Sequence, residues 1–343
     1  MERNRSIDLL KLIAIIFVVF IHNPFYSKIG FAMDALCRFG VPIFFMITGY
    51  FIGKENNLSY KIKKQIPKLV KYYIVYEMIY MFYDFCMAIY YNKIFEFQNN
   101  LLLNLKLILI APTMGHHLWY LINLILVLIV ILIFNEFNKL KELFAVSVFL
   151  HVFSIIAANL YMLELNIPLY FIRNFIFLGL FYVLLGIFIN NLEIHKITIN
   201  KNIILLFSIF MCLSQIFERF IWRKAFGSIF GDYFFTTIFA CIGIFVYILK
   251  TKIDNKYVNI LSVYSMPIYF LHVLAMQILN QFGNNFFNLE LIKKTIPGNV
   301  MFVVCVCVLS CFLYNISTKG IHKSKLIIKD KIQIITKKYR STN

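Results

Sequence analysis

Charged residues are scarce in this sequence, and their scarcity excludes a soluble globular domain. Only 15% of the 343 residues are charged, whereas 61% are hydrophobic. A soluble domain of this length needs far more polar surface to face water. We therefore expect an all-α, multi-pass transmembrane helix bundle.

Several motifs that would indicate other chemistry are also missing. The sequence holds no Walker-type loop, no glycine-rich dinucleotide fingerprint and no cluster with metal-ligand spacing. The adjacent His116 and His117 would diverge by ~100° on a helix, so we predict no metal. The seven cysteines are scattered without paired spacing, which predicts no disulfide framework. No linker rich in Pro, Gly or Ser divides the chain, so we expect one membrane domain over 1–318 and a basic cytoplasmic tail over 319–343.

Long hydrophobic runs are abundant, by contrast. About ten runs of roughly 18 to 22 residues are each long enough to cross ~30 Å of hydrocarbon as a helix. The expected spans are Leu9–Ser27, Asp34–Gly53, Leu69–Tyr91, His117–Phe134, Leu143–Leu160, Tyr170–Asn190, Ile203–Phe220, Gly231–Leu249, Ile260–Gln281 and Val300–Thr318.

The basic residues predict the orientation of these spans. With the N-terminus inside, 23 of the 34 Lys and Arg residues fall in inner segments, 8 in outer segments and 3 within spans. Basic residues are retained on the cytoplasmic side, so we expect both termini there. The net charge of +18 then reflects basic loops and a basic tail against anionic lipid headgroups. Membrane lipids, and not nucleic acid, are the expected partners.

The first hydrophobic run carries three residues that are costly in hydrocarbon: Asp8, Lys11 and His22. Lys11 and His22 are eleven residues apart, just over three helical turns, so they share one face and lie ~16 Å apart along the axis. The orientation places Lys11 toward the cytoplasm and His22 toward the outer leaflet. A simpler alternative is an interfacial Asp8–Lys11 pair with snorkelling side chains, and a structural His22.

Five further polar or amphipathic side chains fall at a similar predicted depth, in the outer half of the membrane: Arg38, His117, Trp119, Arg173 and His272. Polar groups at bilayer depth face the bundle interior, which predicts that the histidines and arginines share one outward-facing cavity with His22. The alternative is that each is an interfacial anchor, which is typical of tryptophan.

Five segments in order resemble successive signatures of the acyltransferase 3 family, the integral membrane acyltransferases that modify bacterial surface glycans. They are "NRSIDLLKLIAIIFVVFIH", "RFGVPIFFMITGYFIG", "HHLWYLINLIL", "RNFIFLGLFYVLLG" and "YSMPIYFLH". The resemblance covers nearly the whole chain. It implies a protein of the bacterial plasma membrane that takes an acyl group, most often acetyl, from cytoplasmic acyl-coenzyme A. The acceptor would be a hydroxyl of a saccharide or lipid-linked glycan.

The resemblance also implies roles for individual residues. The family places a basic residue, usually Arg, before a His with ten residues between them, and Lys11 and His22 match that pair. Lys11 would then meet the donor phosphates as a point charge, without the bidentate fork of Arg. Two arginines of the family's first inner loop are matched loosely by lysines. The donor-side candidates there are Lys61, Lys64 and Lys68.

For the reaction, neutral His22 would take the proton of the acceptor hydroxyl as it attacks the thioester carbonyl. A transient acyl-histidine is the other route. Arg38 or Arg173 would stabilise the oxyanion or hold the acceptor. We expect the remaining acceptor contacts from His117, Trp119 and His272.

Two other classes of function stay open at the level of sequence. Gly40, Pro42, Gly49 and Pro267 could break helices, as in a transporter or flippase of a glycan or lipid-linked sugar. Such a transporter needs no thioester site on the cytoplasmic side. A structural membrane subunit would not need histidines and arginines at bilayer depth.

Overall fold

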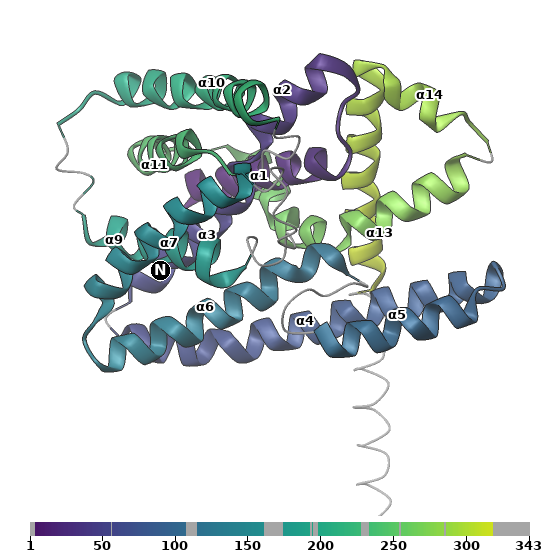
Figure 1. The fold of residues 1–343 in the computed structure, drawn as a ribbon, viewed down its shortest axis with the longest axis horizontal. Coiled ribbons are helices and arrows are strands. Elements are labelled where there is room, and N and C mark those ends of the chain that lie inside the picture. The colour runs from purple at the N-terminus through teal and green to yellow at the C-terminus, as the bar shows by residue number, and fades with distance from the viewer. Residues whose placement is uncertain are drawn as a thin grey trace, which may run out of the picture. The chain divides into compact units, whose positions relative to one another are not determined.

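The protein is built from helices throughout the part of the chain that the structure describes (Figure 1). This computed structural model describes residues 4–55, 57–107, 115–160, 174–192, 194, 198–227, 233–253, 255–284 and 286–317. No strand occurs among them, which confirms the all-α prediction. The chain divides into two compact units, Met1–Val263 and Tyr264–Asn343.

The first unit contains most of the helices. They are α1 (Arg5–His22), α2 (Ser27–Cys37), α3 (Gly40–Gly53), α4 (Leu58–Tyr90), α5 (Ile94–Leu107), the 3₁₀ turn η1 (His116–Leu118), α6 (Trp119–Glu136), α7 (Leu140–Leu160), the π-helical turn η2 (Phe175–Gly179), α9 (Leu180–Asn191), α10 (Lys201–Phe226), α11 (Phe235–Lys250) and α12 (Lys256–Leu261). A 3₁₀ turn, η4 (Ser262–Tyr264), follows at the division. The second unit holds α13 (Ser265–Gly283), α14 (Leu289–Lys294) and a last helix, Ile296–Ser317.

Asparagine begins many of these helices. The Asn4 side chain accepts hydrogen bonds from the backbone N–H groups of Ser6 and Ile7 at 3.1 and 3.2 Å. These donors have no partner within the helix, so the asparagine defines where α1 starts. The same N-cap contact is made by Asn57, Asn174, Asn200, Asn255 and Asn288.

Six helical stretches within the described residues, some of which join consecutive labelled helices, are long and apolar enough to cross a membrane, which agrees with a multi-pass protein. They are Ile29–Gly53, His116–Glu136, Leu140–Asn159, Lys201–Phe226, Lys256–Gly283 and Ile296–Ser317. Phe175–Asn191 and Phe235–Lys250 are shorter apolar helices. The two other expected spans correspond to α1 and α4, which carry more charge. The count of ten, the cytoplasmic termini and the division at residue 318 stay predictions.

Three expected spans have different boundaries in the structure. The span expected over Asp34–Gly53 is two helices, because α2 ends at Cys37 and α3 begins at Gly40. The third expected span lies within α4, whose 33 residues correspond to a length of about 50 Å. The sixth lies partly outside the described residues, and its described part opens with the π-helical turn η2.

Helices α3 and α9 pack closely because glycine faces backbone on both sides. A methyl group at Gly49 would collide with the Val183 carbonyl, and one at Gly186 with the Met46 carbonyl. Small residues let membrane helices approach at this distance, where van der Waals contact and not hydrophobicity holds them together.

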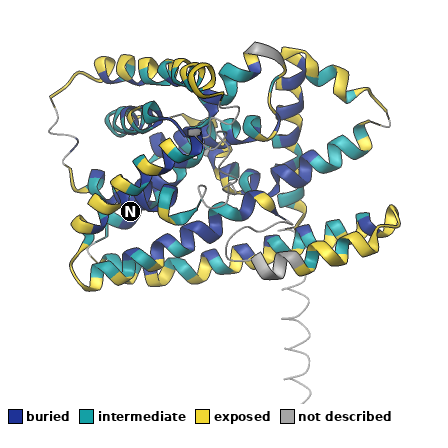
Figure 2. Cartoon of the chain, in the orientation of Figure 1, coloured by how far each residue is buried: buried dark blue, intermediate teal, exposed yellow. Residues whose placement is uncertain are grey.

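Helix α10 shows the opposite pattern, with a long exposed apolar face (Figure 2). Leu206, Phe210, Leu213 and Phe217 are all exposed, and they recur at helical spacing. Such a face is stable only in hydrocarbon or against another apolar surface, so it suits contact with lipid.

Candidate functional site

Three histidines from two elements lie together in the first unit. The rings of His22, at the end of α1, and His116, in η1, have their centroids 6.0 Å apart. The His116 and His117 rings are 6.3 Å apart. His22 and His116 are exposed, whereas His117 is buried. We call His22, His116 and His117 the histidine cluster.

The turn η1 explains why the two adjacent histidines differ in exposure. Gly115 precedes the turn, and its carbonyl accepts a hydrogen bond from the Leu118 N–H at 2.6 Å. Successive side chains of a 3₁₀ turn point about 120° apart, so His116 faces outward and His117 inward. His117 meets the ring of Tyr80 edge-on, with centroids 5.0 Å apart.

Helices α4 and α6 pack together and set the register that brings Tyr80 to His117. At the other end of the pair, Asn135 donates its side-chain N–H to the Ser59 hydroxyl at 2.9 Å. Nearby, Lys63 and Glu136 form an exposed ion pair at 3.5 Å. The two helices are therefore antiparallel and are tied at both ends.

Lys11 lies near the start of α1 and has two contacts there. Its Nζ is 3.2 Å from Asp8 Oδ1 and 5.1 Å from the centroid of the Phe51 ring. The interfacial Asp8–Lys11 pair considered from sequence thus exists. The pair does not occupy the whole ammonium group, since lysine has three N–H donors.

Arg38 lies where α2 ends, and its guanidinium is held in an ion-pair network. Arg38 Nη2 lies 2.7 and 2.9 Å from the two carboxylate oxygens of Asp34. Arg219, on α10, donates to the same carboxylate and, at 2.9 Å, to the Phe31 carbonyl. We call Asp34, Arg38 and Arg219 the arginine cluster. It joins α2 to α10.

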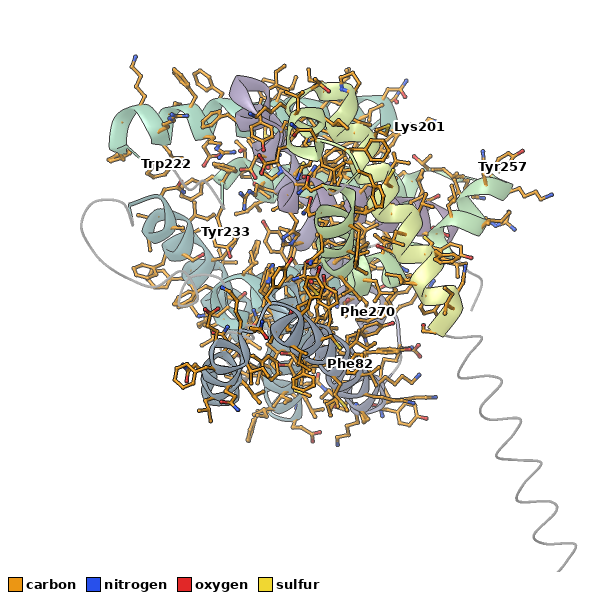
Figure 3. The ribbon with its side chains drawn as sticks, turned by 90° about the vertical axis from the view of Figure 1, so that its right-hand side faces the viewer. Phe82, Lys201, Trp222, Tyr233, Tyr257 and Phe270 are labelled. Carbon is orange, nitrogen blue, oxygen red and sulfur yellow. The ribbon has the colours of Figure 1, made fainter. Side chains whose placement is uncertain are left out.

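The chain around Arg38 also borders α1. Phe39 packs on Phe17 with ring centroids 5.1 Å apart. One turn beyond Arg219, Trp222 (Figure 3) donates to Glu218 at 3.3 Å. Glu218 also accepts from the Phe235 and Thr236 N–H groups, so it caps α11.

The other predicted acceptor-side residues are dispersed. Trp119 is half-buried at the start of α6, next to the histidine cluster in sequence. His272 belongs to the second unit, where its Nδ1 lies 3.0 and 2.8 Å from the Ile268 and Tyr269 carbonyl oxygens. Arg173 lies outside the described residues. The structure therefore brings His116 to His22, with His117 beside His116, and leaves a shared cavity for the predicted residues as a prediction.

The donor-side lysines begin α4. Lys61 pairs with Glu55 at 2.6 Å, and Lys64 lies 5.9 Å from the centroid of the Tyr60 ring. Lys64 and Lys68 are exposed. The spacing of these lysines places them along one side of α4.

Sequence reasoning missed four residues that the structure places in these clusters: His116, Tyr80, Asp34 and Arg219. His116 was set aside because adjacent helical side chains diverge, whereas the turn lets His116 approach the end of another helix. Tyr80 and Arg219 have no local motif, because their partners lie on other elements. Asp34 has one, since Arg38 follows it four residues later on the same face of the helix.

His151, in α7, has structural surroundings. Its Nδ1 lies 2.8 Å from the Phe177 carbonyl in the π-helical turn η2. Its ring stacks on Phe181 at 4.6 Å and lies 6.4 Å from that of Tyr233 (Figure 3). His151 thus contacts a backbone carbonyl of the π-helical turn, where the regular hydrogen-bond pattern of an α-helix is interrupted.

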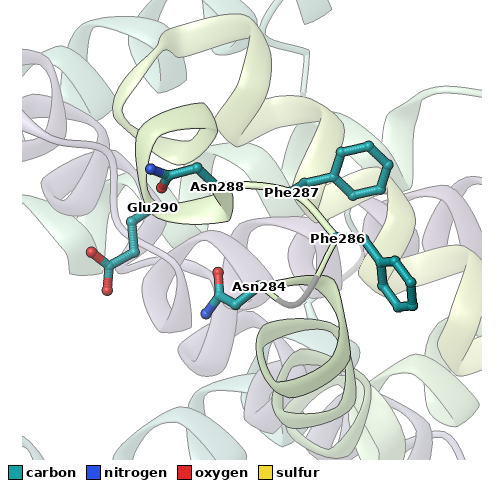
Figure 4. Close-up of a pocket in the computed structure, with 5 residues that line it drawn as sticks. All are labelled: Asn284, Phe286, Phe287, Asn288 and Glu290. Atoms are coloured by element: carbon teal, nitrogen blue, oxygen red, sulfur yellow. The ribbon is translucent and has the colours of Figure 1, made fainter.

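One surface hollow has no part in these clusters. It lies in the second unit and is lined by Asn284, Phe286, Phe287, Asn288 and Glu290 (Figure 4). Its polar side chains lie on one side and its two phenylalanines on the other. None of the predicted site residues lines it. Among the described residues, no group of three or more His, Cys, Asp or Glu side chains could hold a metal ion.

Comparison with known proteins agrees with the resemblance in the sequence. The acyltransferase domain family matches residues 4–315. An amino-acid racemase of Enterococcus faecalis is 26% identical over 341 residues, which cover 93% of this chain and 47% of that protein. The chain thus spans about half the length of that curated relative. No solved structure matches the chain significantly. Since the family match covers nearly the whole chain, this multi-pass membrane protein belongs to the acyltransferase domain family.

Proposed function

We propose that this protein transfers an acyl group, acetyl in the first instance, from cytoplasmic acyl-coenzyme A to a hydroxyl of a saccharide. The acceptor would be a surface glycan or a lipid-linked glycan at the outer half of a bacterial plasma membrane. Family membership supports acyl transfer. The basic residues, which are concentrated in the predicted inner segments, support a donor site on the cytoplasmic side.

The observation that carries the proposal is the meeting of His22 with His116 at the end of α1. Both imidazoles are exposed, so a substrate can reach them. His22 would take the proton from the acceptor hydroxyl while that oxygen forms a bond to the thioester carbon. The carbon–sulfur bond then breaks, and coenzyme A leaves as a thiolate that is protonated. A transient acyl-histidine on His22 is the alternative route to the same products.

The arginine cluster supports a second role in this reaction. The oxygen of the attacked carbonyl becomes negative, and a fixed cationic donor stabilises it. Arg38 would serve here or hold the acceptor, as would Arg173. Asp34 and Arg219 keep the Arg38 guanidinium in one place, and a fixed donor costs less reorganisation during the reaction.

The donor would reach the histidine cluster along α1. Lys11 lies ~16 Å from His22 along the helix axis, a distance that the extended pantetheine arm of coenzyme A can bridge. Lys11, Lys61, Lys64 and Lys68 would meet its phosphates. His117, Trp119 and His272 would contact the saccharide.

Two experiments together test the proposal. Acyl-coenzyme A should bind the purified protein, and deletion of the gene should remove one class of acyl ester from the surface glycans, as measured by mass spectrometry. Intact acylation in the deletion strain, with no donor binding, would contradict it.

A transporter of a glycan or lipid-linked sugar remains the second candidate, because two features favour it. Helices α2 and α3 are broken at Arg38–Phe39, and α9 is preceded by a π-helical turn. Broken helices are typical of transporter binding sites. Transport without donor binding would support this candidate. We do not propose racemisation, the activity in the relative's name, for this chain. The segment that the two proteins share covers most of this chain's acyltransferase domain and only about half of the racemase.

A further inference from the structure

Helix α4 presents a polar and aromatic face toward the histidine cluster. Tyr73, Glu77 and Tyr80 follow one another at i, i+4 and i+7, so they lie on one face of the helix. Tyr73 and Tyr80 are buried, and Tyr80 contacts His117. Glu77 is the carboxylate between the two tyrosines.

Glu77 contacts the residue that precedes both histidines of η1. Its carboxylate interacts with the Gly115 backbone, which lies directly against it. A methyl group added at Gly115 would lie 3.1 Å from Glu77 Oε2 and 2.6 Å from Leu118 Cδ1. Any other residue at 115 would therefore press on the carboxylate. Glu77 Oε2 is itself buried.

Two residues of α4, Glu77 and Tyr80, hold the turn η1 in place. Glu77 holds the first residue of the segment 115–118, and Tyr80 packs on its third, one turn further along α4. His116 lies between these two points and reaches across to His22. A carboxylate at this depth in an apolar helix is costly, and such residues are retained for function more often than for stability.

We propose that Glu77 is the positioning residue of the histidine cluster, which acts by holding the Gly115 N–H so that His116 meets His22. This inference rests on the proposed acyl transfer for its kinetic consequence. The geometric claim stands apart from it and is tested separately.

Two substitutions separate the hydrogen bond from the charge. Glu77→Gln keeps an oxygen that accepts from Gly115, whereas Glu77→Leu keeps similar volume and removes the acceptor. A displacement of about 1 Å at a reacting group lowers turnover by roughly 10²-fold. We expect Glu77→Leu to lower kcat on that order with the KM for acyl-coenzyme A unchanged, and Glu77→Gln to stay within a few-fold of the parent.

Cross-linking measures the geometry without relying on acyl transfer. His22→Cys and His116→Cys are combined, and a short bis-methanethiosulfonate reagent links the two thiols in membranes. The linked peptides are quantified by mass spectrometry, so the native cysteines need not be removed. We expect a high yield with Glu77 or Glu77→Gln and a several-fold lower yield with Glu77→Leu. Gly115→Ala, which presses on the same contact and keeps the carboxylate, should lower the yield as well.

Asp84→Leu is the matched control, because Asp84 is the other carboxylate of α4 at membrane depth and lies two turns further along. It should leave the yield unchanged. Equal yields in all variants, or an equal loss in Asp84→Leu, would overturn the positioning role. Equal loss of turnover in Glu77→Gln and Glu77→Leu would also overturn it, since the charge would then be what matters. A Glu77-dependent yield, together with no acyl transfer by the parent protein that retains His22, would retain the geometry and contradict only the proposed reaction.

Discussion

The histidine cluster and the arginine cluster both border α1, yet they are built in opposite ways. His22 and His116 are exposed and meet as rings at the ends of two elements. The side chains of Arg38, Asp34 and Arg219 are only 17%, 12% and 11% exposed and are linked by charge. A general base must exchange protons with a substrate, so exposure suits it. A buried ion pair is instead suited to fixing the position of its members.

This difference in exposure gives His22 and Arg38 different expected effects on substitution. His22 was predicted to be the catalytic base from the family resemblance, and Arg38 was predicted to stabilise the oxyanion or hold the acceptor. The structure gives them different surroundings: substitution at His22 should affect the reaction, and substitution in the arginine cluster should affect the fold as well. Four variants, ordered from the largest expected effect to the smallest, test this comparison.

His22→Gln should give the largest effect. Loss of a general base lowers turnover by about 10²- to 10⁴-fold, because no group then takes the acceptor proton. The variant should still insert in the membrane and bind acyl-coenzyme A, which is measured by donor binding alongside glycan acylation.

His151→Gln is the matched control for this variant. His151 is buried and holds a carbonyl of η2, so its loss should lower thermal stability while each surviving molecule keeps its turnover. If His22→Gln behaved in the same way as His151→Gln, His22 would be structural and the base would have to be sought elsewhere.

Asp34→Asn should give the next effect, and mainly on stability. The change leaves two guanidinium groups side by side without their shared carboxylate. Removing one partner of a fully buried pair costs about 3–5 kcal/mol, and the partial exposure here points to about 2–3 kcal/mol. Thermal unfolding in detergent measures it, with the exposed Glu96→Gln as control. Unchanged stability would mean that the cluster does not join α2 to α10.

Lys11→Ala should weaken donor binding by about tenfold, the equivalent of ~1.4 kcal/mol for one charged contact. Lys11→Arg should keep or improve the affinity, because the guanidinium adds a bidentate fork. Isothermal titration with acyl-coenzyme A distinguishes them. Equal affinity in all three proteins would leave Lys11 with only its contacts to Asp8 and Phe51.

Much of the fold follows from the sequence because hydrophobic length is a direct physical requirement of a membrane. The all-α class and the multi-pass character could be predicted from the apolar runs alone. The break after Cys37 could not, although Gly40 and Pro42 indicated that some break was possible. The expected span Asp34–Gly53 takes in the end of α2 and all of α3, so length alone does not show where the helix ends.

The candidate site could be predicted only in part, since its contacts join residues far apart in the chain. The expected proximity of His117 to His22 stays a prediction, since the ring that lies next to His22 is that of His116. His116 was missed because a helix was expected where the structure has a 3₁₀ turn. The repeat of Tyr73, Glu77 and Tyr80 was a usable signal, since a polar face at helical spacing in an apolar helix indicates buried contacts.

Lys63→Ala should give the smallest effect and sets the lower limit of the comparison. The Lys63 and Glu136 side chains are 63% and 56% exposed and lie 3.5 Å apart, at the end of the α4–α6 pair far from the histidine cluster. Exposed pairs of this kind contribute at most about 1 kcal/mol, because water screens the charges and both side chains lose freedom. The midpoint temperature of thermal unfolding should therefore shift little. The affinity for acyl-coenzyme A should fall less than it does in Lys11→Ala. A loss of affinity equal to that of Lys11→Ala would move the donor phosphates to the Lys63 side of α4. It would also remove the argument that α1 connects the donor to the histidine cluster.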